Sequence, residues 1–168
     1  MELVDLYDEN RIPLGRTAQR YSRREKGTYR LIVHICIFDR KNRLLIQRRA
    51  KEKRLWSEKW DLSAAGGVSA GETTRAAAQR EVGEELGLSL DLTGVRALCT
   101  VNFATGFDDY FVIRREVDLS ALRLQQEEVS DVRWATRKEV LSMVRRGEFI
   151  NYPESFLGYL FDSAASKK

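Results

Sequence analysis

Residues 66–88, which read GGVSAGETTRAAAQREVGEELGL, are the most informative part of this chain. A helix is predicted over residues 73–86, because Gly87 follows at the position where helices commonly end. At about 100° per residue, Glu81, Glu84 and Glu85 lie on one narrow face of that helix. The neighbouring stripe of the helix is apolar, so it can pack on a sheet.

Three carboxylates crowded on one helix face need a physical explanation. Like charges at positions i and i+4 destabilise a helix, so Glu81 and Glu85 repel one another. A divalent cation removes that repulsion, and a ligand set made only of oxygen atoms favours Mg²⁺ or Mn²⁺ over zinc. The Gly-rich loop before the helix lets backbone carbonyls approach the same ion, and Arg80 can pair with Glu72 or Glu81. The alternative, a solvated acidic helix end, places acids where they oppose the helix dipole.

The spacing of these residues resembles the Nudix box, Gly-x5-Glu-x7-Arg-Glu-U-x-Glu-Glu-x-Gly-U, in which U is aliphatic. Every specified position of that pattern is met between Gly66 and Leu88. The resemblance implies an α/β fold, the α/β/α sandwich with a mixed β-sheet. It also implies a hydrolase that cleaves a diphosphate linkage in a nucleoside diphosphate joined to another group, or in a similar small molecule.

The resemblance also implies roles for the residues of the box. Glu81 and Glu85 are the expected main metal ligands, Glu84 is a further ligand, and Gly66 supplies a backbone carbonyl. Arg80 is an expected catalytic residue, because it can hold a carboxylate in position. Mg²⁺ or Mn²⁺ bound there would cancel phosphate charge and acidify the attacking water.

The base that takes the proton from water has several candidates. Glu81 is one, and members of the family also place the base in a later loop. Glu127 and Glu128 precede an expected strand, and Asp108 and Asp109 stand before another expected strand. Each of these four acids can also be a solvated loop residue. Among them Glu128 is favoured as a catalytic residue.

Segments outside the box resemble the branch of the family that contains isopentenyl-diphosphate isomerase. They are Asp5-Leu6-Tyr7-Asp8-Glu9, Leu14-Gly15, Gln47-Arg48-Arg49-Ala50, Lys53 and Trp60-Asp61-Leu62-Ser63. In the isomerases, residues matching Arg49 and Lys53 hold the diphosphate. The alternative for both residues is a solvated surface charge.

The chain departs from the isomerases at the positions that matter for isomerisation. They carry a catalytic Cys where this chain has Ala65, and a metal-binding His where it has Gly67. Isomerase activity is therefore an alternative disfavoured by these two residues. A second alternative is a non-catalytic ligand-binding module, against which the complete set of acids argues.

The aromatic and sulfur-containing residues receive plainer interpretations. His34 is expected as a core residue rather than a ligand, and Cys36 as core rather than nucleophile, because both lie in an apolar run. Phe103, Phe107 and Tyr110 are candidates to line a substrate entrance.

The whole chain has the length and composition of one domain, predicted over residues 1–168. Its 168 residues are 43% hydrophobic and 32% charged, which excludes a disordered chain and a collagen-like fibre. Strands and helices are expected to alternate, as in a layered α/β domain. The expected elements are a hairpin at 2–16, a buried strand at 31–38, a partner strand at 44–47, a loop or strand end at 63–68, strands at 95–102, 110–117 and 129–134, and helices at 136–146 and 153–161.

The partners and location are expectations from charge and hydropathy. Residues 1–60 hold 16 Lys and Arg against 8 Asp and Glu, which suits a phosphate-bearing ligand or a solvated basic face. Nucleic acid is not expected as a partner, since the formal net charge is only +4 and acidic residues lie close to the basic ones. The sequence holds no long apolar run and no secretory signal, so no membrane partner and a cytoplasmic location are expected. A homodimer is a candidate assembly, since dimers are common in the family.

Overall fold

The computed structural model describes residues 2–23 and 25–166. The domain predicted over residues 1–168 therefore includes positions 1, 24, 167 and 168, which lie outside the described residues. The elements, in chain order, are β1 (Leu3–Tyr7), β2 (Pro13–Gln19), β3 (Arg30–Phe38), β4 (Leu44–Arg49), β5 (Trp60–Asp61), β6 (Ala64–Gly67), α1 (Thr74–Leu86), β7 (Cys99–Phe103), β8 (Gly106–Arg114), the 3-10 turn η1 (Leu119–Ala121), β9 (Val129–Ala135), α2 (Arg137–Arg145) and α3 (Glu154–Ser166).

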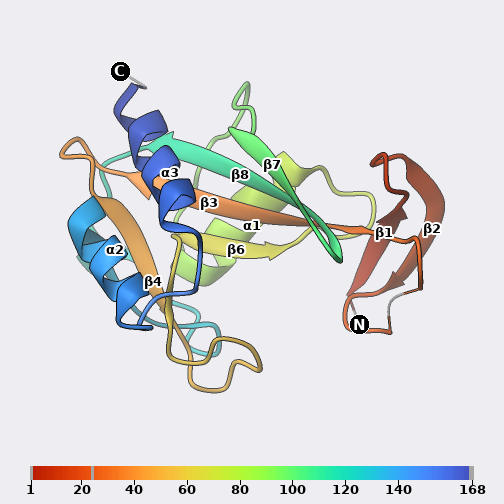
Figure 1. The fold of residues 1–168 in the computed structure, drawn as a ribbon, viewed down its shortest axis with the longest axis horizontal. Helices are drawn as coiled ribbons and strands as arrows, with labels where there is room; N and C mark the ends of the chain where they lie inside the picture. Colours follow the sequence, from red (N-terminus) through yellow and green to blue (C-terminus); the bar gives the residue numbers. More distant parts are fainter. Residues whose placement is uncertain (1, 24, 167–168) are drawn as a thin grey trace.

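A seven-stranded mixed sheet forms the centre of the molecule (Figure 1). Its main path runs β5-β4-β3-β8-β7, with β6 added to β3 and β9 added to β4. The β3–β8 ladder is parallel and the other ladders are antiparallel. The expected mixed sheet is thus confirmed.

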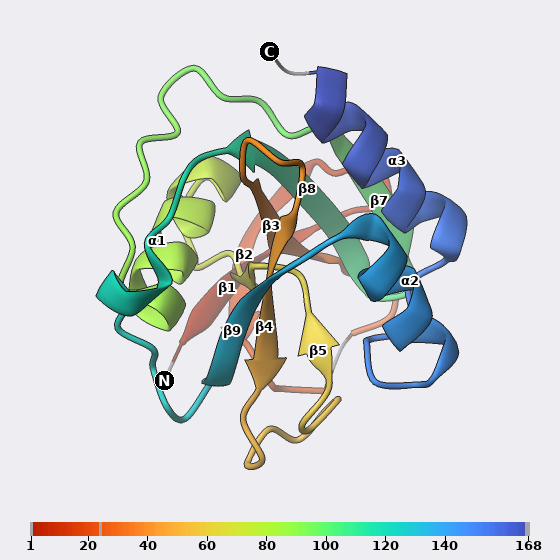
Figure 2. The same ribbon diagram turned by 90° about the vertical axis from the view of Figure 1, so that its left-hand side faces the viewer.

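Strand β3 is the middle of the core, because helices cover both faces of the sheet (Figure 2). Its side chains at Leu31, Val33, Ile35 and Ile37 belong to the apolar cluster that includes α1. The alternate side chains at Cys36 and Phe38 belong to the cluster that includes α2 and α3. A strand buried on both faces explains the continuous apolar run, and the α/β/α sandwich is confirmed.

Strands β3 and β4 meet at Phe38 and Leu44 and then separate. Beyond that point β3 pairs with β6, whereas β4 pairs with β9 and β5. The sheet therefore opens between the start of β3 and the end of β4. This opening positions the site described below.

The N-terminal hairpin forms a separate two-stranded sheet, β1–β2, beside the main body (Figure 1). Tyr7 forms a bridge to Tyr29, and Arg11 forms an ion pair with Asp109. Strand β2 is largely exposed, since the hairpin packs on the body mainly through β1. The predicted hairpin is confirmed.

Helix α1 begins and ends at the residues that its sequence indicates. The Thr73 hydroxyl accepts a hydrogen bond from the Ala76 amide, which caps the first turn. Gly87 ends the helix with φ of 64°, a left-handed conformation that favours glycine. The expected helix at 73–86 is thus confirmed.

Two strand boundaries differ from expectation. Strand β7 begins at Cys99 rather than at residue 95, and β8 covers Gly106–Arg114 rather than 110–117. The reason is the parallel ladder with β3, which starts where Arg30 faces Gly106. A Cβ on Gly106 would overlap the Arg30 carbonyl, so the close approach requires glycine. Asp108 and Asp109 therefore lie within a strand, and their interpretation as solvated loop acids is wrong.

The C-terminal residues form the expected docked helix. Helix α3 packs Leu157, Leu160 and Phe161 into the core. No helix in the described part of the chain is long and apolar enough to cross a membrane.

Candidate active site

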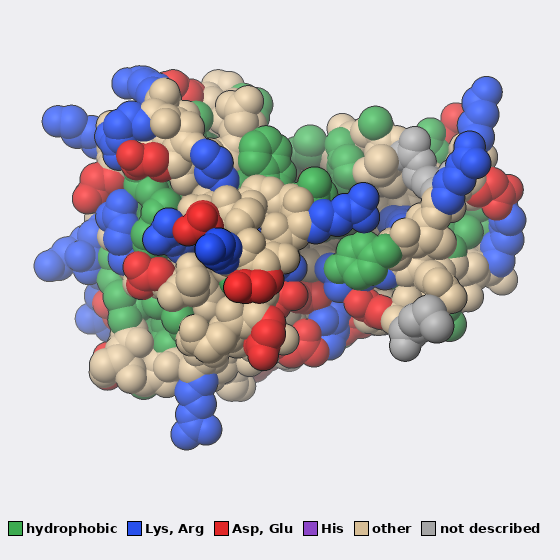
Figure 3. Space-filling view, turned by 90° about the horizontal axis from the view of Figure 1, so that it is seen from below, with side chains coloured by type: hydrophobic (Ala, Val, Ile, Leu, Met, Phe, Trp, Pro, Cys, Tyr) green, Lys and Arg blue, Asp and Glu red, His purple; other side chains and the backbone are tan. Residues whose placement is uncertain are grey.

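A cavity of about 700 Å³ lies where strands β3 and β4 separate. Its lining comes from both strands, from β6, from α1, and from the segments around residues 20 and 128. Figure 3 shows a hollow between the main body and the hairpin in which acidic side chains meet basic ones. The cavity thus combines opposite charges around one space.

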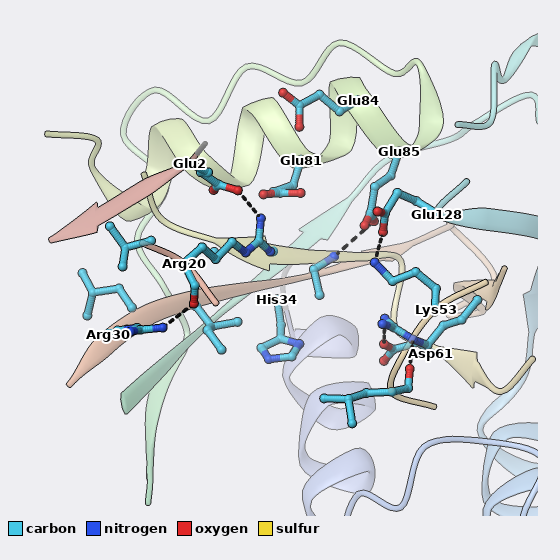
Figure 4. A pocket seen from close by; sticks show the side chains of 18 of the residues that line it. Glu2, Arg20, Arg30, His34, Lys53, Asp61, Glu81, Glu84, Glu85 and Glu128 are labelled. Carbon is cyan, nitrogen blue, oxygen red and sulfur yellow. Dashed lines mark hydrogen bonds and ion pairs between the residues drawn. The ribbon is translucent and has the colours of Figure 1, made fainter. Parts of the chain in front are cut away.

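Helix α1 presents its three carboxylates to this cavity (Figure 4). Glu81 and Glu85 are buried, each with 5% of its surface exposed, whereas Glu84 is about half exposed. The neighbouring stripe of α1 packs Ala78, Val82 and Leu86 on the sheet, which fixes the direction of the carboxylates. The face predicted from helical spacing is the face that lines the cavity.

Arg80 holds the acidic face in place. Its guanidinium donates to the carboxylates of Glu72 at 3.0 Å, Glu81 at 2.7 Å and Glu84 at 3.1 Å. It also donates to the carbonyl of Gly67 at 2.9 Å. The hydrogen bond to Glu72 is the main reason that the pKa of Arg80 is raised. Arg80 thus ties α1 to β6 and orients Glu81.

Glu85 has a different environment. The amide of Gln47 donates to its carboxylate at 3.0 Å, and the backbone N–H of Ala65 donates at 3.3 Å. Burial, followed by the nearby charge of Glu81, raises the pKa of Glu85 to about 8. Burial also raises the pKa of Glu81, although Arg80 opposes the shift. Two buried acids with raised pKa values in one cavity are typical of a functional site.

The residues present fit a divalent cation. The expected ligands, the carboxylates of Glu81, Glu84 and Glu85 and the backbone carbonyl of Gly66, all supply oxygen, which is the ligand type that Mg²⁺ and Mn²⁺ prefer. A Cβ on Gly66 would overlap the carboxylate of Glu81, so a glycine here lets that carboxylate lie against the backbone. Among the described residues no three acidic, His or Cys side chains are already gathered for a metal, because Glu81 and Glu84 are turned toward Arg80.

The opposite wall of the cavity is basic. Lys53 forms an ion pair with Glu128, and Arg49 lies 3.4 Å from a carboxylate oxygen of Asp61. Both cations line the cavity, together with Glu128. The charge of Glu128 contributes to raising the pKa of Glu85, so these acids interact across the space. The structure therefore brings Arg49, Lys53 and Glu128 to the carboxylates of α1.

Other predicted candidates lie elsewhere. Glu127 is exposed, and neither it nor Asp109 is among the described residues that line the cavity. Asp109 is buried and binds Arg11 and Thr100. Phe107 and Tyr110 are core residues rather than part of an entrance.

Cys36 and Phe103 lie where they were expected, whereas His34 differs from its expected role. Cys36 is fully buried in the core, as expected, and Phe103 lines the cavity. His34 is mostly buried but also lines the cavity, so it is more than a core residue.

Several residues of the cavity were not predicted from the sequence. Arg20, at the end of the hairpin, packs its guanidinium against Gly67 and pairs with Glu2 at 2.7 Å. Tyr152 donates its hydroxyl proton to Asp61 at 2.9 Å. The basic cluster in the first 60 residues was the one available signal for Arg20. Nothing local indicated that Tyr152 would reach the site.

Comparisons with known proteins agree with this fold. The family described as "NUDIX domain" matches residues 28–153. A Nudix hydrolase of Listeria monocytogenes named as uncharacterised is 48% identical over 162 residues, which are 96% of this chain and 95% of that protein. An isopentenyl-diphosphate Delta-isomerase of Brevibacterium linens is 31% identical, with 86% of this chain and 82% of that protein covered. The crystal structure of DR0079 from Deinococcus radiodurans shares the fold, with a TM-score of 0.78 at 21% identity, over 95% of this chain and 99% of that one.

Proposed function

Because this chain belongs to the Nudix family, we propose that it is a metal-dependent hydrolase that cleaves a diphosphate linkage in a small molecule. The substrate would be a nucleoside diphosphate joined to another group, or a similar compound. The observation that carries the proposal is the pair of buried carboxylates, Glu81 and Glu85, facing the basic residues Arg49 and Lys53 in one cavity. Carboxylates that face basic side chains across one cavity could bind a cation together with the phosphates whose charge the cation would neutralise.

Glu81, Glu85, Glu84 and the carbonyl of Gly66 would hold Mg²⁺ or Mn²⁺. When bound, such a cation neutralises phosphate charge and lowers the pKa of the attacking water. Arg80 would keep Glu81 oriented through its hydrogen bonds to Glu72 and Gly67.

The basic residues would bind the phosphates directly. Arg49 and Lys53 already stand in the cavity wall beside acids that they pair with. A phosphate group would compete with Glu128 for Lys53, so substrate binding would release the Glu128 carboxylate. Glu128 or Glu81 would then accept the proton of the attacking water.

Isomerase activity is the first alternative, since relatives with that name match the chain. Allylic isomerisation needs a group that moves a proton at carbon, and Ala65 cannot do so. Cys36 is fully buried, and burial raises the pKa of its thiol, so it cannot replace the missing group. The second alternative is a non-catalytic ligand-binding module.

The test is release of phosphate-containing products from a panel of diphosphate compounds with Mg²⁺ or Mn²⁺. The panel includes nucleotide sugars, dinucleotides, nucleoside triphosphates and isopentenyl diphosphate. Wild type is compared with Glu85→Gln and with Glu127→Gln, a control on an exposed acid outside the cavity. We expect metal-dependent hydrolysis that Glu85→Gln abolishes and Glu127→Gln retains.

Other outcomes separate the alternatives. Conversion of isopentenyl diphosphate without hydrolysis would identify an isomerase. No turnover of any compound, combined with tight binding of one, would identify a binding module.

Location and assembly belong to the same proposal. We expect a cytoplasmic protein that acts on a small molecule rather than on nucleic acid, with a homodimer as a candidate assembly. Cell fractionation and light scattering of the purified protein test these two expectations.

A further inference from the structure

His34 occupies a part of the cavity that the proposed hydrolysis does not use. It lies in the middle of β3, opposite Ala65 of β6 and beside Tyr110 of β8. Its side chain points to the α3 side of the sheet, whereas the carboxylates of α1 lie on the other side (Figure 4). The cavity is lined by both, so it reaches from one face of the sheet to the other.

The imidazole of His34 is held firmly in this wall. Its Nε2 lies 3.2 Å from Oδ2 of Asp108. One ring face stacks on Tyr110, with 4.5 Å between the ring centres and 7° between the planes. The ring of Tyr152 lies edge-on to the imidazole, with 6.3 Å between the ring centres. The Tyr152 hydroxyl donates a hydrogen bond to Asp61, and Asp61 also forms an ion pair with Arg49. Arg49, which is expected to bind phosphate, is therefore connected to His34 through this chain of contacts, and both residues belong to one wall of the cavity.

The His34–Asp108 pair has unsatisfied polar atoms. Nδ1 of His34 and Oδ1 of Asp108 are buried and lack a hydrogen-bond partner among the described residues. A buried polar atom without a hydrogen-bond partner destabilises the folded protein. Apolar residues at these two positions would avoid that cost, so stability does not explain the pair.

We infer that His34, supported by Asp108, recognises a polar, hydrogen-bonding group on the organic part of the substrate and disfavours an isoprenoid chain. This inference rests on the proposed function, because it places the phosphates at the α1 side of the same cavity. The attached group would then extend past Ala65 to the His34 wall on the α3 side. His34 is thus a specificity-determining residue.

The chemistry of the wall supports this selection. A hydrocarbon chain packed against His34 would leave the buried Nδ1 of His34 and Oδ1 of Asp108 without hydrogen bonds. A group with its own donors and acceptors, such as a nucleobase or a sugar, could supply them. A site built from hydrogen-bonding groups discriminates strongly against an analogue that lacks the matching groups.

The experiment measures binding by isothermal titration calorimetry in EDTA, where metal-dependent turnover does not occur. The polar probes are ADP-ribose, UDP-glucose and diadenosine tetraphosphate. The isoprenoid probes are isopentenyl diphosphate and geranyl diphosphate, and inorganic pyrophosphate reports on the phosphate site alone. Wild type is compared with His34→Leu, which is apolar, and with His34→Gln, which keeps hydrogen-bonding capacity.

We expect wild type to prefer its best polar probe over its best isoprenoid probe, and His34→Leu to reduce that ratio by about tenfold or more. His34→Gln should restore most of the ratio, and pyrophosphate affinity should stay within about twofold in all three proteins. A ratio that favours isoprenoids in wild type, or that His34→Leu leaves unchanged, would overturn the inference. If His34→Leu does not fold, as judged by circular dichroism, Asp108→Asn takes its place in the same comparison.

The result is independent of hydrolysis. A chain that turns over no compound yet loses its polar preference in His34→Leu would refute the proposed function and keep the inference. If the chain hydrolyses its substrate but His34→Leu leaves the preference for polar probes unchanged, the proposed function would stand and the inference would be refuted.

Discussion

Glu85 and Asp109 are equally buried acids with opposite electrostatics. They expose 5% and 3% of their surfaces. Burial alone would raise the pKa of Asp109, but hydrogen bonds from Arg11 and Thr100 outweigh it, and the pKa is lowered. Burial and the charge of Glu81 raise the pKa of Glu85 to about 8, because its hydrogen bonds come from the neutral Gln47 and Ala65.

The difference separates a structural acid from a functional one. The guanidinium of Arg11 donates to the two carboxylate oxygens of Asp109, at 2.8 and 2.5 Å, and this pair holds the hairpin to the body. The protein itself therefore supplies the positive charge that balances Asp109. Among the described residues no cation pairs with Glu85. A buried acid with no counter-charge destabilises the fold when ionised, so its cation is expected from outside.

The largest expected effect comes from exchanging each of these two acids for its amide. Glu85→Gln should lower metal-dependent hydrolysis by about 10³-fold without lowering the free energy of unfolding. Asp109→Asn should keep most of the activity but lower the free energy of unfolding by about 1–2 kcal/mol, since Arg11 is one-third exposed. Steady-state kinetics and urea denaturation measure both. Equal loss of activity in the two variants would remove the distinction.

A smaller effect is expected from adding one methyl group beside the acidic face. In Gly66→Ala the new Cβ would overlap the Glu81 carboxylate and displace it, so hydrolysis should fall by about 10²-fold. In the control Gly67→Ala the Cβ would lie 3.1 Å from Nε of Arg20, which is flexible enough to move. Metal affinity from calorimetry should fall in the first variant. Equal affinities in both variants would contradict the assigned position of Glu81.

The pH dependence of stability should distinguish Glu85 from Asp109. The folded protein holds the Glu85 proton up to about pH 8, whereas the unfolded chain releases it near the ordinary pKa of a glutamate, 4.5. Without metal, the Glu85 contribution to stability should therefore fall by roughly 3 kcal/mol as pH rises from about 5 to about 8.

Asp109, with its lowered pKa, contributes stability that is lost as pH falls below about 4. Urea denaturation in EDTA across this range is the measurement. The slope between pH 5 and 8 should be weaker in Glu85→Gln, and an unchanged slope would show that Glu85 is not its source.

The smallest expected effect lies in the basic wall. Lys53→Met keeps the length of the side chain but removes its charge, so KM should rise about tenfold with a smaller change in kcat. Lys51→Met, on an exposed neighbour outside the cavity lining, is the control. A similar KM in both variants would place the phosphates elsewhere, for instance nearer Arg20.

Much of the fold was predictable because its signals are local. The apolar run at 31–38 marked β3, and the helical spacing of Glu81, Glu84 and Glu85 placed them on one face of α1. Strand starts were less predictable, since β8 begins where Gly106 can approach Arg30, a contact between residues far apart in the chain. The loop interpretation of Asp108 and Asp109 failed for the same reason.

The sequence by itself determined the identity and alignment of the acidic residues, because a helix repeats every 3.6 residues and needs no distant partner. Tertiary structure alone decided what faces them. Lys53 meets Glu128 across 75 positions, and Tyr152 reaches Asp61 across 91. Alternation in β3 limited His34 to one of two faces, but the separation of β3 from β4 turned that face into a cavity wall. Such contacts depend on how strands pair, which residue spacing does not encode.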